Sequence, residues 1–346
     1  MDDAGLEGVT TKPSPLHVAH RNVLRAAVEA AIQAPSSHNT QPWRFRITEG
    51  RLELRADPDR HLHVIDAERR QQIQSCGCAL YNARVAVRAE GFVDDVSIIL
   101  TDGIDPDLLW TLRIGEPHIS TEEELGLMNA IPLRHTNRRP FLPRPVSAAI
   151  TDRLIAVAAA WGATMVRLDP EHKRVVGELV DRADRLQYGD PAFRSELARW
   201  LAPTGSGRRD GIPFVEKEYG SVLPFTVARA LRSPHLGADF GALESELITG
   251  APVVLVMGTR GDTPGEWLGC GEALEAVLLH ATMAGLSAAF LNQVLEIPDL
   301  RGELAERIPG LGFPQMVLRL GVPEESIHRA APRRDLSEVL EVVGDA

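Results

Sequence analysis

The sequence predicts an α+β fold built from two tandem copies, each with helices packed against a mainly antiparallel sheet. Three observations predict it. Trp43–Thr48 and Arg51–Ala56 alternate apolar and polar residues around a Glu-Gly pair, which is typical of a β-hairpin. Longer segments carry apolar residues at helical spacing. Two of these segments, Cys76–Gly91 and Cys270–Gly285, resemble each other, which indicates an internal repeat.

The first copy starts with a predicted helix over 17–33, where apolar residues recur at helical spacing. Pro35 ends this helix, because proline lacks an amide hydrogen and clashes with the preceding turn. The hairpin follows. Beyond it, the apolar pattern predicts a long helix and two strands, over 67–91, 96–100 and 107–114.

The second copy starts near Thr121, which precedes Glu124 at the spacing of a capping box and therefore predicts a helix start. Many prolines and glycines make 202–235 a loop-rich excursion, and 333–346 is a tail of mixed character. The remaining apolar patterns predict helices over 146–161, 171–185, 191–200 and 268–285, and strands over 163–169, 251–258, 287–290 and 315–320.

The repeat sets the predicted domain boundaries. His20–Asn22 and His135–Asn137 form a second, weaker match, and the interval between the two matches is longer in the second copy. We therefore expect a flexible leader at 1–15, a first copy at 16–119, and a second copy at 120–346 with a lid-like insertion at about 187–240. The alternative is that two alanine-rich helices resemble each other by chance. The matching positions of the repeated helices are Cys76/Cys270, Gly77/Gly271, Ala79/Ala273, Leu80/Leu274 and Gly91/Gly285.

Composition excludes several classes of function. The formal net charge of −11 argues against a broad nucleic-acid surface. Three cysteines cannot form a disulfide framework and fit a reducing cytoplasm, and they lack the partner ligands of a zinc site. No segment approaches the ~20 apolar residues of a membrane span, and the N-terminus has no signal-peptide pattern. We expect a cytoplasmic protein without nucleic-acid or membrane partners.

The segment Ala34–Trp43, APSSHNTQPW, gathers side chains that bind small polar ligands. Ser36, Ser37, Asn39 and Gln41 offer donors and acceptors on an irregular backbone that follows a helix. Serine and asparagine also favour turns, so the same residues fit a capping turn. Taken alone, the residues leave a ligand site and a turn equally open.

A second segment, LRHTNRRPF at Leu133–Phe141, places three arginines beside Thr136. The planar guanidinium group donates several hydrogen bonds at once and suits an oxyanion, so the segment predicts a phosphate site. Arg333 and Arg334 form another basic cluster near the C-terminus. The alternative for each cluster is a solvated surface loop.

With these motifs in hand, the chain resembles the nitroreductase superfamily, and in its duplicated form the fused, dormancy-associated nitroreductase-like proteins of actinobacteria. The superfamily pattern Pro-Ser-Ser-x-Asn-x-Gln-Pro-Trp stands at 35–43, and its Arg-x-Thr-x-Arg motif stands at 134–138. The first copy lacks the arginine motif, and the second lacks the serine-rich segment. The resemblance implies a three-layer α/β/α nitroreductase-like fold, with two copies forming an internal pseudo-dimer that keeps one FMN site.

The resemblance also implies which residues bind FMN, and it implies no metal and no dedicated catalytic acid or base. The flavin ring and ribityl chain would contact Pro35, Ser36, Ser37 and Asn39. The phosphate and ribityl oxygens would be held by Arg134, Thr136 and Arg138, with Arg333 or Arg334 completing the phosphate site. Asn292 and Gln293, placed by counting from Gly285, would line the ring near its reactive nitrogen.

The implied activity is ping-pong transfer of hydride from NAD(P)H, through the flavin, to a small-molecule acceptor such as a nitroaromatic or quinone. Two alternatives stay open: an FMN-storage or sequestering protein with little turnover, and a structural paralogue that has lost FMN. The complementary motifs in opposite halves argue against the second alternative. An internal pseudo-dimer makes a monomer or weak dimer the expected state.

Overall fold

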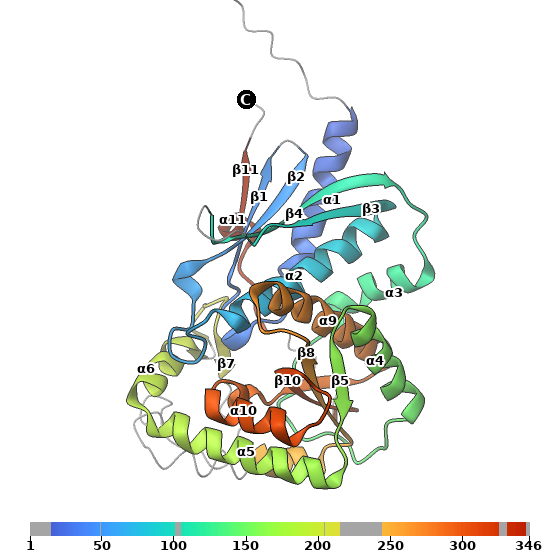
Figure 1. Ribbon diagram of the computed structural model, residues 1–346. Helices are drawn as coiled ribbons and strands as arrows, with labels where there is room; N and C mark the ends of the chain where they lie inside the picture. The colour runs from blue at the N-terminus through green and yellow to red at the C-terminus, as the bar shows by residue number, and fades with distance from the viewer. Residues whose placement is uncertain are drawn as a thin grey trace, which may run out of the picture.

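A computed structural model of the chain describes residues 15–48, 50–100, 105–203, 205–214, 244–324 and 331–343 (Figure 1). The first half forms an antiparallel sheet in the order β1-β2-β4-β3, covered by two long helices. A 3₁₀ turn at Ser37–Asn39 follows the first helix. The elements are α1 (Pro15–Ala31), β1 (Trp43–Thr48), β2 (Arg51–Ala56), α2 (Arg70–Ala89), β3 (Phe92–Ile98) and β4 (Leu108–Pro117).

The second half repeats this topology. Its four strands pair in the order β5-β8-β10-β9, every pair antiparallel, and therefore match β1-β2-β4-β3 strand for strand. The helices α4 and α9 stand where α1 and α2 stand in the first half. The elements are α3 (Glu122–Ala130), α4 (Ala148–Ala160), β5 (Thr164–Arg167), β8 (Val253–Thr259), α9 (Pro264–Met283), β9 (Ser287–Phe290), α10 (Pro298–Arg307) and β10 (Phe313–Gly321).

The longer second copy owes its length to the connection between β5 and β8. In the first half only two residues separate the end of β1 at Thr48 from the start of β2 at Arg51, whereas here residues 168–252 separate β5 from β8. The insertion predicted at about 187–240 therefore begins earlier, directly after β5, and its residues 215–243 lie outside the described part of the chain. The described elements of the insertion are α5 (Pro170–Gly189), α6 (Pro191–Trp200) and the short strands β6 (Leu201–Pro203) and β7 (Ile212–Phe214).

The two faces of the second sheet bury different cores. Along β8, Val253, Leu255 and Met257 join the central core with α9, while Val254 and Val256 pack with α5 and α10. Successive side chains of a strand point to opposite faces, so one short apolar run serves both cores. Figure 1 shows α9 between the two sheets and α5 and α10 beyond the second. The three-layer α/β/α arrangement is thus confirmed in the second half, and the first sheet is covered by α1 and α2 on its inner face.

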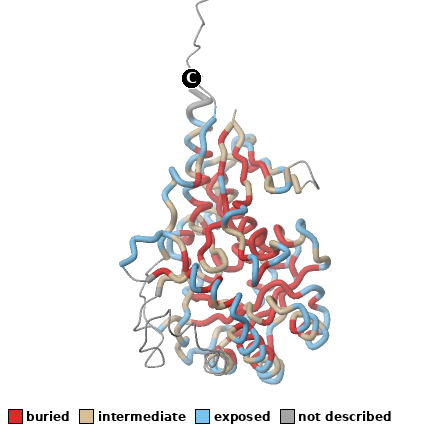
Figure 2. Tube along the Cα trace, turned by 90° about the vertical axis from the view of Figure 1, so that its left-hand side faces the viewer, coloured by how far each residue is buried: buried red, intermediate tan, exposed pale blue. Residues whose placement is uncertain are grey.

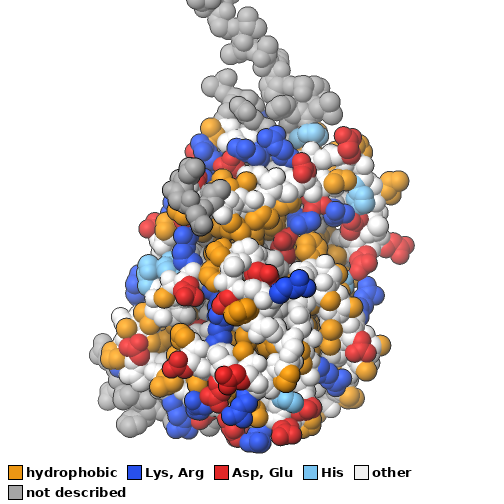
Figure 3. Space-filling view, viewed as in Figure 1, with side chains coloured by type: hydrophobic (Ala, Val, Ile, Leu, Met, Phe, Trp, Pro, Cys, Tyr) orange, Lys and Arg blue, Asp and Glu red, His pale blue; other side chains and the backbone are white. Residues whose placement is uncertain are grey.

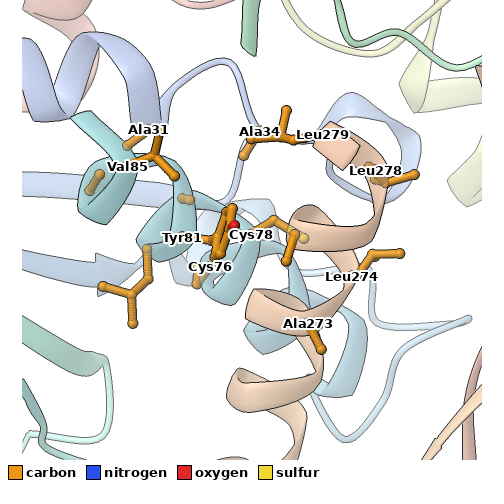
Figure 4. Close-up of a cluster of buried hydrophobic side chains, with 14 of the residues drawn as sticks. Ala31, Ala34, Cys76, Cys78, Tyr81, Val85, Ala273, Leu274, Leu278 and Leu279 are labelled. Atoms are coloured by element: carbon orange, nitrogen blue, oxygen red, sulfur yellow. The ribbon is translucent and has the colours of Figure 1, made fainter. Parts of the chain in front are cut away.

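The central core joins the halves through the repeated helices. Gly77 of α2 lies against Gly271 of α9, and the Cys78 thiol donates to the Gly271 carbonyl at 3.2 Å. A β-carbon at Gly77 would overlap the Leu268 carbonyl oxygen, so the helices approach this closely only because both positions are glycine. Figure 4 shows the apolar side chains that surround this crossing. Figure 2 shows buried residues concentrated along the middle of the molecule, where the two halves meet.

The C-terminal segment corrects the predicted domain boundary. Residues 331–343 leave the second half and end in a short helix α11 (Leu336–Val339) and a strand β11 (Leu340–Val343). This strand pairs in parallel with β1, with Leu340 opposite Phe45, and so becomes the edge of the first sheet. The second copy was predicted to run to residue 346, but the strand at its C-terminal end belongs to the sheet of the first half.

Most predicted elements are confirmed within a few residues, including the hairpin and the Thr121 capping box. The sequence did not predict α10 or β11. No helix among the described residues is long and apolar enough to cross a membrane, and those residues contain no cluster of three potential metal ligands. Acidic and basic side chains are interspersed over the face seen in Figure 3, so charge of one sign does not gather on that face. Residues 1–14 of the predicted leader lie outside the described range.

Candidate functional site

A cavity of about 900 Å³ lies where loops of the two halves meet the insertion. The structure brings ten of the eleven predicted site residues to this one cavity, and Arg334 is the exception. The segments involved are far apart in sequence, so folding, and not proximity along the chain, assembles the site. The predicted residues that line the cavity are Pro35, Ser36, Ser37, Asn39, Arg134, Thr136, Arg138, Asn292, Gln293 and Arg333.

The first-half loop is held in a strained backbone conformation. His38, Asn39 and Gln41 have φ values of 51°, 52° and 50°, in the left-handed region that side chains other than glycine seldom adopt. The Ser36 hydroxyl accepts a hydrogen bond from the Gln41 amide at 3.0 Å and fixes the turn. The predicted capping turn and the predicted ligand site are therefore the same structure, because the turn presents these side chains to the cavity.

Asn39 connects this loop to two distant segments. Its side-chain amide donates to the Gly211 carbonyl at 3.0 Å and to the Pro332 carbonyl at 3.2 Å. The Gly211 amide in turn donates to the Asn39 carbonyl at 3.1 Å. Gln41 adds a bond from its side-chain nitrogen to the Arg209 carbonyl at 2.7 Å. The insertion is thus attached directly to the loop that lines the cavity.

The arginine motif is positioned by the second sheet. The Asn137 amide donates to the Ala288 carbonyl of β9 at 2.8 Å. From β10, Arg319 donates to the carbonyls of Arg139 at 3.0 Å and Asn137 at 3.3 Å. Between these two anchored residues, the side chain of Arg138 lines the cavity and makes no hydrogen bond within the described residues. Arg138 is therefore the guanidinium of the motif that is best placed to bind an anion.

Arg319→Met is expected to loosen this segment. Arg319 is 2% exposed, and its loss leaves the carbonyls of the half-buried Asn137 and Arg139 without this donor and removes a guanidinium that stacks 4.8 Å from the Phe141 ring. We expect a loss of about 1–3 kcal/mol in the free energy of unfolding, measured by urea denaturation. Arg307→Met, which removes an exposed arginine paired with Glu303, should change it by less than about 0.5 kcal/mol. Equal effects of the two changes would contradict the positioning role.

Arg134, the first residue of the motif, faces the protein interior. Its Nε lies 3.6 Å from a carboxylate oxygen of Glu275, and a terminal nitrogen donates to the Gln33 carbonyl at 3.2 Å. Glu275 is fully buried on α9, and burial raises the pKa of its carboxyl to about 7 despite the opposing charges of Arg134 and Arg333. Arg134 lines the cavity, but its charge is largely matched inside the protein.

The structure gives Arg333 and Arg334 uses that differ from the predicted phosphate contact. The Arg333 guanidinium donates to Asn39 Oδ1 at 3.1 Å and to the carbonyls of Gln33 and Ala34 at 3.0 and 3.2 Å. Burial, then the nearby Arg134, lowers its pKa to about 9. It braces the loop that carries the serine-rich motif. Arg334 lies outside the cavity lining, where its amide donates to Gln41 Oε1 at 2.8 Å.

Asn292 and Gln293, predicted to line the flavin ring, lie in the cavity lining on a 3₁₀ turn at Asn292–Leu295. The side-chain oxygen Oδ1 of Asn292 accepts from the Val317 amide at 3.1 Å, which fixes the turn to β10. Gln293 forms a side-chain hydrogen bond with Asp184. Asn292 therefore serves the local fold, whereas Gln293 belongs to a polar group that the sequence did not predict.

That polar group contains Gln71, Asp184, Gln187 and Glu296, all lining the cavity. The amide nitrogens of Gln71 and Gln187 donate to the two carboxylate oxygens of Glu296 at 2.9 and 2.6 Å. The Ser37 hydroxyl donates to Gln71 Oε1 at 2.5 Å and joins the group to the first-half loop. The run RRQQIQ, which places polar residues at the start of an otherwise apolar helix, is a sequence signal that could have indicated the part of Gln71 in this group.

Asp184 and Glu296 titrate far from the ordinary range of carboxyls. Burial raises the pKa of Asp184 to about 8, and the neighbouring Glu244, Glu296 and Asp181 raise it further against one hydrogen bond from Gln293. Burial raises the pKa of Glu296 to about 7, opposed by the bonds from its two glutamines and by the charge of Arg70.

Asp184→Asn is therefore expected to alter how stability depends on pH. A carboxyl whose pKa is higher in the folded protein stabilises the fold at low pH, and this contribution is lost as pH rises through the folded pKa of about 8. The melting temperature of the wild type, relative to the variant, should fall between pH 5 and pH 8.5. A constant difference across that range would show that Asp184 titrates normally.

Several buried polar atoms of the lining have no partner inside the described protein. They include His38 Nδ1, Gln74 Oε1, Asn137 Nδ2 and Asp184 Oδ2. Buried polar atoms are rarely left unpaired, so these atoms favour a polar ligand in the cavity. Burial lowers the pKa of His38 to about 4, which keeps its ring neutral at pH 7. A flavin with many polar atoms and one phosphate fits this combination of unpaired groups and the Arg138 guanidinium.

Comparisons with known proteins agree on one family. A model described as the nitroreductase family matches residues 20–75. The chain is 31% identical over 341 residues to the Mycobacterium tuberculosis protein named "Putative NAD(P)H nitroreductase Rv3131", with 98% of this chain and 96% of that one covered. It is also 31% identical to "Putative NAD(P)H nitroreductase acg" of the same organism, with 93% and 96% covered.

Among solved structures, the chain is similar to an FMN- and NADPH-dependent nitroreductase, NfnB, from a Sphingopyxis strain. The identity is 21% and the TM-score 0.40, with 63% of this chain and 99% of that one covered. A nitroreductase with bound FMN from Bacteroides fragilis gives 12% identity and a TM-score of 0.39, with 63% and 98% covered.

Proposed function

This chain belongs to the nitroreductase family, and on that premise we propose that it binds one FMN in the cavity between its halves and passes hydride from NAD(P)H to a small-molecule acceptor. One observation carries the proposal. The Pro-Ser-Ser-x-Asn segment of the first half and the arginine motif of the second line the same cavity, although about 95 residues separate them in the sequence.

The bound FMN would supply the hydride chemistry, and the chain would supply orientation and electrostatics. Arg138 would bind the phosphate, because its guanidinium is the one in the motif without a hydrogen bond among the described residues. Thr136 and Arg134 would line the ribityl chain, and Ser36, Ser37 and Asn39 would position the ring edge. The segment around Gly211, attached to Asn39, would limit the access of water to the ring.

We further infer that the fold arose by duplication and acts as an internal pseudo-dimer. The two sheets share one strand order, and equivalent glycines meet at the contact between equivalent helices. The crossing of β11 into the first sheet binds the halves together and favours a monomer or weak dimer. Cys76, Cys78 and Cys270 are free and buried, in keeping with the cytoplasmic location predicted from the sequence.

A second candidate function is FMN storage or sequestration with little turnover. The observation that favours it is the attachment of the insertion to the cavity loop through Asn39–Gly211 and Gln41–Arg209. An insertion fixed in this way would cover the flavin, whereas an insertion that opens would admit nicotinamide and acceptor in turn.

Anaerobic stopped-flow spectroscopy of the FMN-loaded protein separates the two functions. Mixing with NADPH, and separately with NADH, should bleach the oxidised flavin band within seconds, and a quinone should then restore it. Photoreduction of the same sample controls for a flavin that cannot accept electrons at all. FMN that stays bound and oxidised for minutes with both nucleotides would contradict the enzyme proposal and support storage.

A further inference from the structure

The insertion adds one acidic and one amide side chain to the cavity lining, and neither belongs to the repeated part of the fold. Asp184 and Gln187 lie one turn apart on α5 and therefore on the same face of the helix. The connection that contains α5 has no counterpart between β1 and β2. This part of the cavity wall thus occurs in the second copy alone. The repeated fold does not require it, so we look for its role in ligand binding.

Among the described residues, the atoms of this wall that are not already used in hydrogen bonds are acceptors. The side-chain nitrogens of Gln71 and Gln187 are already used on Glu296. Asp184 is 2% exposed, and its Oδ2 is buried without a hydrogen-bond partner among the described residues. Once Asp184 is ionised, above its pKa of about 8 or when a cation binds, a ligand that satisfied this wall would have to donate hydrogen bonds.

The wall also lacks a matching positive charge. Within the described residues Asp184 forms no ion pair. The charged groups that raise its pKa are Glu244, Glu296 and Asp181, and all three are acidic. Burying an uncompensated carboxylate costs several kcal/mol unless it is protonated or paired with a cation. Two arginines of the lining, Arg319 and Arg138, lower the pKa of Glu244, and Arg70, which lies outside the lining, lowers that of Glu296.

On the basis of the proposed function, we propose that Asp184, Glu296 and Gln187 form a subsite for a cationic N–H group, so that the preferred electron acceptors carry an amidinium or ammonium group. The subsite binds the positive end of the acceptor, and it adjoins the proposed flavin-binding residues, because Gln293 forms a hydrogen bond with Asp184. A planar amidinium matches a carboxylate with two parallel hydrogen bonds. The inserted helix thereby selects the substrate as well as covering the site.

A pair of shape-matched probes tests the subsite. FMN-loaded protein is titrated calorimetrically at pH 8 with 4-nitrobenzamidine, a cation, and with 4-nitrobenzamide, its neutral counterpart. We expect the amidine to bind at least about 10-fold more tightly to the wild type, which is typical of a close buried charge pair. Asp184→Asn, a change of almost no volume, should abolish that preference.

Asp181→Asn is the matched control, because Asp181 lies one turn away on α5 and pairs with the exposed Arg185 instead of lining the cavity. It removes the same charge and should keep most of the preference. Equal binding of the two probes by the wild type, or equal losses in the two variants, would overturn the inference. A preparation that does not take up FMN contradicts the proposed function instead, and the same titrations on flavin-free protein then still test the carboxyl subsite.

Discussion

Gly77→Val is expected to cost about 3 kcal/mol or more of the free energy of unfolding, because it places a branched side chain where α2 and α9 touch. Even the first carbon of the new side chain would overlap the Leu268 carbonyl oxygen and come within 3.0 Å of the Gly271 α-carbon. Both obstacles are backbone, so no side-chain rotation relieves them. The helices would have to separate, and the core between the two halves would lose its packing. Urea denaturation followed by circular dichroism measures the loss.

Gly269→Ala provides the control within α9. This glycine is also helical, but a β-carbon there meets no atom within 4 Å. Alanine should leave stability unchanged or raise it by about 0.5–1 kcal/mol, because glycine is the poorer helix former. If Gly77→Val were tolerated as well as Gly269→Ala, the helix contact would not be the junction that holds the halves together.

Arg138→Ala is expected to weaken FMN binding by about 10- to 100-fold, since it removes a charge-assisted hydrogen bond worth about 1.5–3 kcal/mol. Arg138 lines the cavity without a hydrogen bond inside the described protein, so its removal should leave the fold intact. Fluorescence titration of the flavin-free protein with FMN gives the dissociation constants. Riboflavin, which lacks the phosphate, should bind the wild type and the variant alike.

Arg21→Ala is the matched control, because Arg21 lies on α1 and does not line the cavity. It occupies the region where the first copy lacks the arginine motif. We expect unchanged FMN affinity. A similar loss in both variants would mean that net charge, and not a phosphate contact, governs binding.

The local structure was largely predictable from the sequence. Alternation in Trp43–Thr48 identified the hairpin, Thr121 and Glu124 identified a helix start, and the repeated Cys-Gly pair identified the two central helices. Each of these signals lies within a short window and depends on periodicity or capping. The repeat showed that Gly77 and Gly271 are equivalent positions, but only the structure shows that they are in contact.

The long-range features were not predictable. β11 has mostly exposed side chains, and its parallel partner β1 lies almost 300 residues earlier, so no local pattern announces the pairing. α10 is polar for most of its length, and its two buried leucines are too few to mark a helical face. The insertion was predicted too short because α5 looks like an ordinary amphipathic helix of the fold.

The candidate site also contains some residues that the sequence could predict and others that it could not. The sequence marked its two motif segments as candidate ligand-binding loops, and both line the same cavity. The role of Arg333 was not, because a basic residue in sequence gives no sign that it will bind backbone carbonyls instead of phosphate. Asp184 and Glu296 were also missed. A carboxyl in a helix or a turn is usually solvated, and only the fold shows that the buried Asp184 and the half-buried Glu296 share one cavity wall.

Calorimetric titration of the flavin-free chain with FMN tests most directly whether the two halves build a single flavin site. The serine-rich segment occurs only in the first half and the arginine motif only in the second, so the predicted stoichiometry is one FMN per chain. Ser37→Ala and Arg138→Ala, one change in each half, should both weaken that one binding event. A stoichiometry of two, or no binding of FMN by the folded wild-type chain, would contradict the account.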